Sequence, residues 1–205
     1  KFDVGLDMNL FDKISLTVDY FHDKRYDQLV SRGDIPVIIG IGHSPNNIAE
    51  TINQGFDGQI SYQDRFGNFD FNTNVVFSYA KNKVKYKAEA QQKYSWLAET
   101  GKPLNQPFGY KWVGYYTPED IVKIQSGAKD APAVPYTDIP VQAGDLKYAD
   151  LNNDGTIDDF DKGAIGKPNL PSTTLGWSFG GYWKGFSFNV LFQGSFDYSF
   201  AINGT

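Results

Sequence analysis

The sequence contains no cysteine, one methionine and two histidines among its 205 residues. Without cysteine, the chain forms no disulfide, offers no thiolate nucleophile and builds no cysteine-ligated zinc or iron–sulfur site. No apolar run approaches the roughly 20 residues of a membrane-spanning helix. No signal peptide opens the chain, which begins inside a patterned stretch as if cut from something longer. The chain also lacks an excess of basic residues, since it has 24 acidic and 19 basic ones. The sequence therefore gives no reason to expect a nucleic-acid partner.

What the sequence has in excess is aromatic side chains, including 16 Phe and 13 Tyr, together with 21 glycines. This composition fits β structure better than a helix bundle. Residues 2–10 alternate strictly, with apolar side chains at even positions and polar or small ones at odd positions. A period of two residues predicts a strand with one apolar face and one wet face.

The same alternation recurs along the chain and predicts six strands. Their approximate ranges are 2–10, 14–20, 51–63, 69–81, 174–183 and 186–200. The connections alternate between short and long, and the long ones cover about 25–50 and 82–172. Inside the second, Thr117 followed by Pro118 predicts the start of a short helix.

Short turns alternating with long loops are typical of membrane β-barrels, whose strands need about 9–11 residues to cross the bilayer. The pattern favours an all-β fold, an antiparallel transmembrane β-barrel portion with long extracellular loops. The even residues of 2–10 and the odd residues of 69–79 are expected to face lipid. Six strands cannot close such a barrel, so the chain would be a piece of one. The alternative is a soluble antiparallel sandwich, which also alternates.

The stretch DLNNDGTIDDFD, residues 150–161, matches the spacing of an EF-type calcium loop. That loop places oxygen ligands at positions 1, 3, 5, 7, 9 and 12, with glycine at position 6. Gly155 occupies position 6 and Ile157 is the usual apolar anchor at position 8. The predicted ligands are Asp150, Asn152, Asp154, Thr156 through its carbonyl, Asp158 and Asp161.

Oxygen ligands without a soft ligand nearby favour Ca²⁺ as the bound cofactor. The aspartate at position 12, where glutamate is usual, resembles dockerin-type loops. The sequence entering the loop looks extended, so we do not expect a helix–loop–helix sensor. We expect the ion to hold a long loop in place; the alternative is a solvated acidic turn.

Three segments in order resemble the C-terminal barrel region of SusC/RagA-family TonB-dependent outer-membrane transporters. They are PFGYKWVGYYTPEDI at 107–121, GDLKYADLNNDGTIDDFDKGAIGKPNLP at 144–171 and LGWSFGGYWKGFSFNVLFQGS at 175–195. NQGFDGQISYQ at 53–63 is similar to the family's usual strand entry. The resemblance covers nearly the whole chain and is most specific over 144–195.

The resemblance implies a 22-stranded barrel in the bacterial outer membrane, with an N-terminal plug and a TonB box that this sequence lacks. It also implies a SusD-like surface lipoprotein as partner and TonB as the energy-coupling partner. The expected function is TonB-dependent import of nutrients, either oligosaccharides or peptides. The alternative function is a soluble, calcium-stabilised β-sandwich that acts as a carbohydrate-binding module.

We do not expect an enzyme, because no catalytic constellation is recognisable. His22 and His43 lack triad partners, and GIGHSPNN at 40–47 lacks the context of a phosphate-binding loop. Asp158 and Asp159 are adjacent on one loop and do not face each other across a cleft as glycosidase carboxyls do. Four aromatic residues in the second long connection fit sugar stacking and fit loop packing or partner contact equally well: Tyr110, Trp112, Tyr115 and Tyr116.

Overall fold

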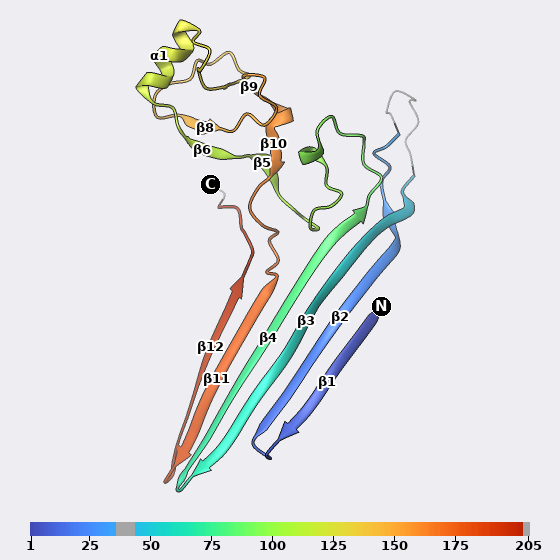
Figure 1. Cartoon of the computed structure of the whole chain (residues 1–205), viewed down its shortest axis with the longest axis vertical. Helices are drawn as coiled ribbons and strands as arrows, with labels where there is room; N and C mark the ends of the chain where they lie inside the picture. Colours follow the sequence, from blue (N-terminus) through green and yellow to red (C-terminus); the bar gives the residue numbers. More distant parts are fainter. Residues whose placement is uncertain (36–43, 203–205) are drawn as a thin grey trace. The chain divides into compact units, whose positions relative to one another are not determined.

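The computed structural model describes residues 1–35 and 44–202, and six of its strands form one antiparallel sheet (Figure 1). The strands are β1 (Phe2–Leu10), β2 (Ile14–Val30), β3 (Asn46–Phe66), β4 (Phe69–Tyr86), β11 (Thr173–Trp183) and β12 (Phe186–Phe196). They are neighbours in that order, so every connection joins strands that lie side by side. This architecture confirms the predicted fold class.

The register of this sheet sorts its side chains onto two faces. Residues directly opposite one another in antiparallel strands share a face. One row across the sheet consists of Leu6, Val18, Gly58, Phe77, Leu175 and Gly194. The adjacent row, on the other side, consists of Asp7, Thr17, Gln59, Val76, Gly176 and Gln193. We call these sides the apolar face and the polar face.

The apolar face is continuous across all six strands. From the row of Thr73 to the row of Tyr79, the described strands place no Asp, Glu, Lys or Arg on it. The Thr73 hydroxyl on this face is satisfied, since it donates to the Ser178 carbonyl at 2.9 Å and accepts from the Trp177 indole at 3.0 Å. The residues predicted to face lipid therefore share one face, and their contact with lipid stays a prediction.

Aromatic rings cover the glycines of the apolar face. The Phe77 ring lies over Gly58, where an added Cβ would come within 2.9 Å of the ring. Phe56 contacts both Phe77 and Tyr79, with ring centroids 6.1 and 5.4 Å apart. Glycine leaves no side chain to pack in a strand, and a neighbouring ring restores the missing contact.

Strands β2 and β3 run further than the sequence predicted. The connection expected at 25–50 is reduced to 31–45, because β2 reaches Val30 and β3 begins at Asn46. The added residues do not alternate between apolar and polar, so the pattern used to find strands is missing there. A register shift between Arg25 and Gln28 marks a bulge in this extension. Similarly, β4 continues to Tyr86, whereas β12 ends at Phe196 and not at 200.

The connection predicted at 82–172 contains a second compact unit, formed by residues 90–98 and 106–166. It includes the 3₁₀ turns Ser95–Leu97 and Asp159–Asp161 and six short strands. These strands are β5 (Phe108–Tyr110), β6 (Trp112–Tyr115), β7 (Val134–Pro135), β8 (Leu146–Tyr148), β9 (Thr156–Ile157) and β10 (Lys162–Ala164). They pair as β5 with β10, β6 with β8 and β7 with β9.

The predicted helix is confirmed as α1 (Pro118–Ser126) in the second unit. Thr117 caps its N-terminus by accepting a hydrogen bond from the Asp120 amide, and the Asp120 carboxylate accepts one from the Thr117 amide in return. Gly127 ends the helix with φ 65°, a left-handed conformation that glycine adopts at little cost. Within the described residues, no helix is long and apolar enough to cross a membrane.

Candidate functional site

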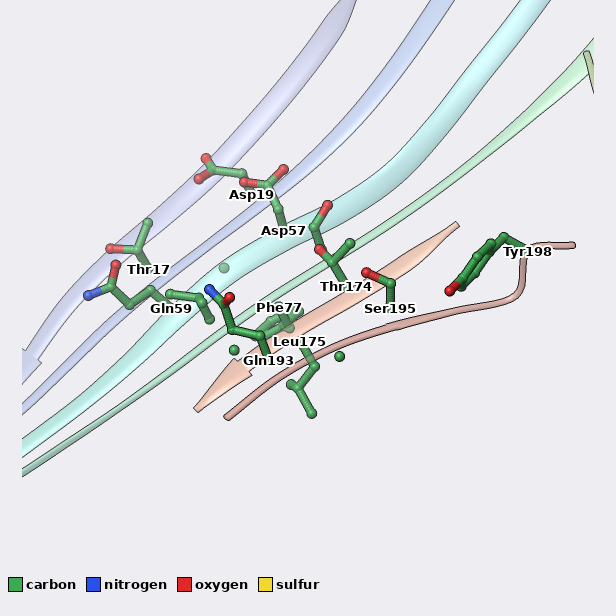
Figure 2. Close-up of a pocket in the computed structure, with 15 residues that line it drawn as sticks. Thr17, Asp19, Asp57, Gln59, Phe77, Thr174, Leu175, Gln193, Ser195 and Tyr198 are labelled. Atoms are coloured by element: carbon green, nitrogen blue, oxygen red, sulfur yellow. The ribbon is translucent and has the colours of Figure 1, made fainter. Parts of the chain in front are cut away.

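The polar face of the sheet carries an open cavity of about 870 Å³ (Figure 2). Much of its lining comes from two rows of that face, the row of Thr17 and the row of Asp19. Hydroxyl, amide and carboxylate groups dominate these rows, with Gln59, Ser78, Thr174, Gln193 and Ser195 among them. Such a surface forms hydrogen bonds to water or to a polar solute, as the lining of an aqueous passage does.

The charge on this face is one-sided. Asp19 on β2 and Asp57 on β3 are direct cross-strand neighbours, and both line the cavity (Figure 2). Asp7 lies one row away and accepts a hydrogen bond from the Thr17 hydroxyl at 2.7 Å. In the described strands, the rows of Asn74, Val76 and Ser78 contain no Lys or Arg. Like charges directly opposite one another are destabilising in a sheet, so this arrangement requires strong solvation.

The acidic loop folds around its own backbone amides. The Asp150 carboxylate accepts from the amides of Asp154 at 3.3 Å and Gly155 at 2.8 Å. The Asn152 carbonyl oxygen accepts from the Asp154 amide, and the Asp154 carboxylate from the Thr156 amide. Gly155 has φ 84°, which confirms the sharp turn expected at position 6.

Asp161, at loop position 12, is fully buried. Its carboxylate accepts from the amides of Leu151 at 2.7 Å, Asn152 at 3.4 Å and Asp158 at 2.9 Å. Three amide donors compensate the desolvation of this charge, and they join the two ends of the loop. In the part of the chain that the structure describes, no three His, Cys, Asp or Glu side chains are gathered closely enough to hold a metal. Calcium binding stays a prediction.

Asp158 and Asp159 have separate structural roles. Asp158 caps a 3₁₀ turn by accepting from the Phe160 amide at 2.8 Å. Asp159 pairs with Lys162 at 2.7 Å, and this contact lowers the pKa of the Asp159 carboxyl. Lys162 also lies over the Tyr110 ring, 5.4 Å from its centroid. Each carboxylate thus has its own local partner, and the two do not act as a pair.

The structure separates the four aromatic residues considered for sugar stacking. Tyr116 is buried, and its hydroxyl donates to the Ala133 carbonyl at 2.6 Å. Tyr110 packs on Tyr148 with ring centroids 5.5 Å apart. Trp112 and Tyr115 are both more than half exposed and contact each other edge to face at 5.7 Å. Only these last two of the four present large free ring surface.

One aromatic cluster was missed by the sequence reasoning. Tyr94 and Trp96 stack at 4.5 Å, and Phe160 meets Tyr94 edge to face at 5.8 Å. The Trp96 indole donates to the Phe160 carbonyl at 2.8 Å, and Lys93 lies 4.5 Å from the Phe160 ring centroid. Segment 90–98 is therefore fastened to the acidic loop. The sequence YSW at 94–96 shows that aromatic side chains are present here, but it does not predict that they contact Phe160.

The two histidines differ in what the structure shows. His22 on β2 contacts Gln54 of β3, with Nδ1 and Oε1 3.2 Å apart. His43 and the rest of the first half of the GIGHSPNN segment, residues 40–43, lie outside the described residues.

The chain matches the family described as TonB dependent receptor-like, beta-barrel, over residues 1–202. The TonB-dependent receptor P26 of Formosa agariphila is 23% identical over 205 residues, covering 94% of this chain and 20% of that protein. Among solved structures, the RagAB peptide importer in its closed-closed state superposes with a TM-score of 0.64 at 19% identity. That match covers 96% of this chain and 21% of the importer chain.

A further structure, of the RagAB peptide transporter, superposes with a TM-score of 0.61 at 19% identity, over 93% of this chain and 20% of that one. The chain thus spans about a fifth of the length of the relatives that it matches. The match at the level of the family covers nearly every residue, and the sheet has the sorted faces that a barrel wall requires. The chain belongs to the TonB-dependent receptor-like β-barrel family and is located in the bacterial outer membrane.

Proposed function

We propose that this chain is part of the wall of a TonB-dependent importer that brings nutrients across the outer membrane. The observation that carries the proposal is the separation of one apolar face from one hydrogen-bonding face across six strands. The apolar face meets lipid and the polar face lines the passage. The chemistry is transfer of an intact solute, with no bond broken.

Two observations support the proposed substrate classes, oligosaccharides or peptides. The resemblance to SusC/RagA transporters favours oligosaccharides or peptides, and the RagAB structures with a similar fold are described as a peptide importer. A SusD-like surface lipoprotein is the proposed partner, and TonB is proposed to act through segments outside residues 1–205. The free rings of Trp112 and Tyr115 provide a surface for the substrate or for this lipoprotein.

The test uses the full-length receptor in its own host. Cells that lack the gene are supplied with oligosaccharides or oligopeptides as sole nutrient, and uptake is compared with cells in which the gene is restored. We expect uptake of one class to require both the receptor and TonB. Uptake that persists after either is removed contradicts the proposal, whereas co-purification of a surface lipoprotein tests the partner separately.

We also propose that the acidic loop binds one Ca²⁺ through Asp150, Asn152, Asp154, Asp158, Asp161 and the Thr156 carbonyl. The support is the sharp turn at Gly155, together with the spacing of the oxygen-bearing residues along 150–161. The Asp161 carboxylate retains acceptor capacity beyond its three amides, because each carboxylate has about four lone-pair sites. Bound calcium would supply charge balance and order; the loop residues hold the turn and position Phe160.

The calcium proposal is tested with the full-length receptor, using Ca²⁺ alone as the probe. Extracellular modules of this kind bind at about 10⁻⁴–10⁻³ M. We expect calcium in this range to protect residues 144–166 from protease and to change the fluorescence of the receptor, with Trp96 beside Phe160 as a reporter. Asp150→Ala with Asp154→Ala should abolish both effects.

The matched control removes two carboxylates outside the ligand set, Asp130→Ala with Asp159→Ala, and should retain the calcium response. If chelation leaves the protease sensitivity of the wild-type loop unchanged, the loop is a solvated acidic turn.

A further inference from the structure

A row of lysines on β4 begins where the apolar face ends. Tyr79 is the last member of β4 in the uncharged part of that face, and Lys81 and Lys83 follow at alternate positions. Because side chains of one strand alternate between faces, both lysines lie on the same side as Tyr79. Their partners on β3 are Gln54 and Ile52, and neither carries a charge.

Both lysines are exposed, and within residues 1–35 and 44–202 neither has an ion-pair or hydrogen-bond partner. The neighbouring basic side chain on this face, Lys24 of β2, is already paired with Glu50 at 3.1 Å. Lys85 is exposed as well, but a register shift opposite it interrupts the alternation, so the inference rests on Lys81 and Lys83.

The opposite side of the sheet is covered at this height. Val84, between Lys83 and Lys85, is buried, and so is Thr51 across from it on β3. Segment 99–105 runs beside β4 here, with the Val84 amide donating to the Lys102 carbonyl and the Gly101 amide donating to the Val84 carbonyl. Lys81 and Lys83 lie on the other side from Val84 and are exposed, with the Lys83 side chain passing near Gly101 of this segment.

Strand geometry gives the depth of these lysines in the membrane. The uncharged part of the apolar face on β4 ends at Tyr79, and Lys81 and Lys83 follow two and four residues later, about 7 and 13 Å along the strand at roughly 3.3 Å per residue. At the tilt of about 40° usual in such barrels, they rise about 5 and 10 Å above Tyr79. Lys81 and Lys83 then come directly above the hydrocarbon, at the level of the lipid headgroups.

A cavity lies beside Lys81, at the level where β11 begins opposite Tyr79 of β4. Its volume is about 380 Å³, and its lining includes Tyr79, Leu104, Lys167 and Leu170. Asp197 also lines the cavity and pairs with Lys167 at 3.6 Å, whereas Lys81 forms no ion pair within the described residues. The lining of this cavity is mixed, with Asn53, Asn82, Asn105 and Asn169 beside the apolar side chains, so the inference rests on the two exposed lysines and not on the cavity.

We propose that Lys81 and Lys83 bind the phosphate groups of the outer-leaflet lipid, the phosphorylated glycolipid that anchors lipopolysaccharide. A free ammonium group at headgroup depth is complementary to a lipid phosphate, and basic clusters beside a membrane span bind anionic headgroups. The commitment to the outer leaflet follows from the predicted topology, which places this end of β4 outside the cell. The contact fixes the height of the barrel wall in the bilayer and is independent of the transported substrate.

The test measures binding of fluorescent lipid A to the full-length receptor in neutral detergent. Lys81→Gln with Lys83→Gln should weaken binding about 30-fold, because each cation near an anionic surface contributes about five-fold. The matched control, Lys111→Gln with Lys129→Gln, removes two exposed lysines of the second unit and should bind as the wild type does. Lys81→Arg with Lys83→Arg should also retain binding.

Two arms with the wild-type receptor keep the test decisive if the glutamine variant fails to fold. Phosphate-free lipid A should bind about as weakly as phosphorylated lipid A binds to the glutamine variant. Inorganic phosphate at millimolar concentration should not displace the lipid. Equal binding of phosphate-free lipid A overturns the proposal, as does unchanged binding by a folded glutamine variant; displacement by inorganic phosphate overturns the lipid as the ligand.

Discussion

At the residue scale, Val75 is the sharpest probe of the apolar face. It lies near the middle of β4 in the uncharged rows, opposite Ile60 and Trp177. Val75→Arg should destabilise the folded receptor by about 2–4 kcal/mol, the cost of a cation near the bilayer midplane. Phe71→Arg should cost less, because Phe71 is two residues from the start of β4 and opposite Asp64. Unfolding of the full-length receptor in lipid vesicles measures both.

The control for these substitutions is Asn74→Arg, which places the same cation on the polar face one residue away. In the wild type, the Asn74 side chain accepts a hydrogen bond from the Ser61 hydroxyl at 2.9 Å on this face. We expect a much smaller loss of stability than for Val75→Arg. If arginine is tolerated equally at positions 74 and 75, the assignment of the two faces is wrong.

Asp120 gives the second unit a dependence on pH. The hydrogen bond from Lys147, at 2.8 Å, lowers the pKa of the Asp120 carboxyl below its ordinary value. A carboxyl whose pKa is lowered by folding stabilises the fold above the unfolded pKa of about 3.9 and loses that contribution as the pH falls through the folded value. Protease cleavage within 106–166 should therefore increase in acid.

Asp120→Asn tests this assignment, because it removes the titrating group and keeps most of the capping geometry. The variant should be cleaved faster than the wild type at pH 7, and the difference should vanish well below pH 4. Asp130→Asn, at an exposed pair with Lys123, is the matched control and should change cleavage less. A wild-type protein whose cleavage is the same at pH 7 and pH 3 would rule out the Asp120 contribution.

At the scale of elements, the hairpins define a topology that tags can check. The short turns at Asp12, Gly67 and Lys184 are predicted to be periplasmic, and the long connections extracellular. Tags inserted after Gly127, beyond the end of α1, should be labelled on intact cells, whereas tags at the three short turns should not. Surface labelling confined to the short turns would invert the topology.

Alternation was sufficient to find the strands that cross the bilayer, because one face must be apolar there and the other wet. The continuation of β2 to Val30 escaped this reasoning, since outside the bilayer both faces are wet and no period remains. The second unit escaped it for another reason. Strands such as Thr156–Ile157 are too short to show a period, and their pairing is set by turns and side-chain contacts.

The acidic loop was predictable in part. Its turn at Gly155 follows from ligand spacing that any reader of the sequence can count. The burial of Asp161 cannot be predicted from this spacing, because it depends on three backbone amides that only the folded loop brings together. The choice among Tyr110, Trp112, Tyr115 and Tyr116 likewise depended on burial, which aromatic composition does not reveal.

At the scale of the whole molecule, the charge of the polar face should influence which solutes enter. Asp19→Asn with Asp57→Asn removes two carboxylates from one cavity and keeps the shape of the side chains. Attraction by a charged wall raises the local concentration of counter-charged solute, so uptake of cationic peptides should fall a few-fold relative to neutral ones. Transport by the full-length receptor at low and high salt measures this effect.

The control pair is Asp130→Asn with Asp138→Asn, which removes the same charge from the second unit. It should leave the preference for cationic peptides unchanged. The effect of the Asp19 and Asp57 substitutions should shrink at high salt, where the Debye length falls to about 3 Å at 1 M. A preference that both double variants share with the wild type would show that this wall does not select by charge.

The length of β3 has a mechanical consequence. Phe56 marks the upper limit of the apolar face on this strand, and ten further residues reach back to its start at Asn46. At roughly 3.3 Å per residue and a tilt of about 40°, that segment rises about 25 Å above the hydrocarbon. The barrel wall thus extends above the hydrocarbon by a height about equal to the thickness of the apolar band. A partner that docks on this rim therefore binds above the headgroups of the neighbouring lipids and makes no contact with the hydrocarbon.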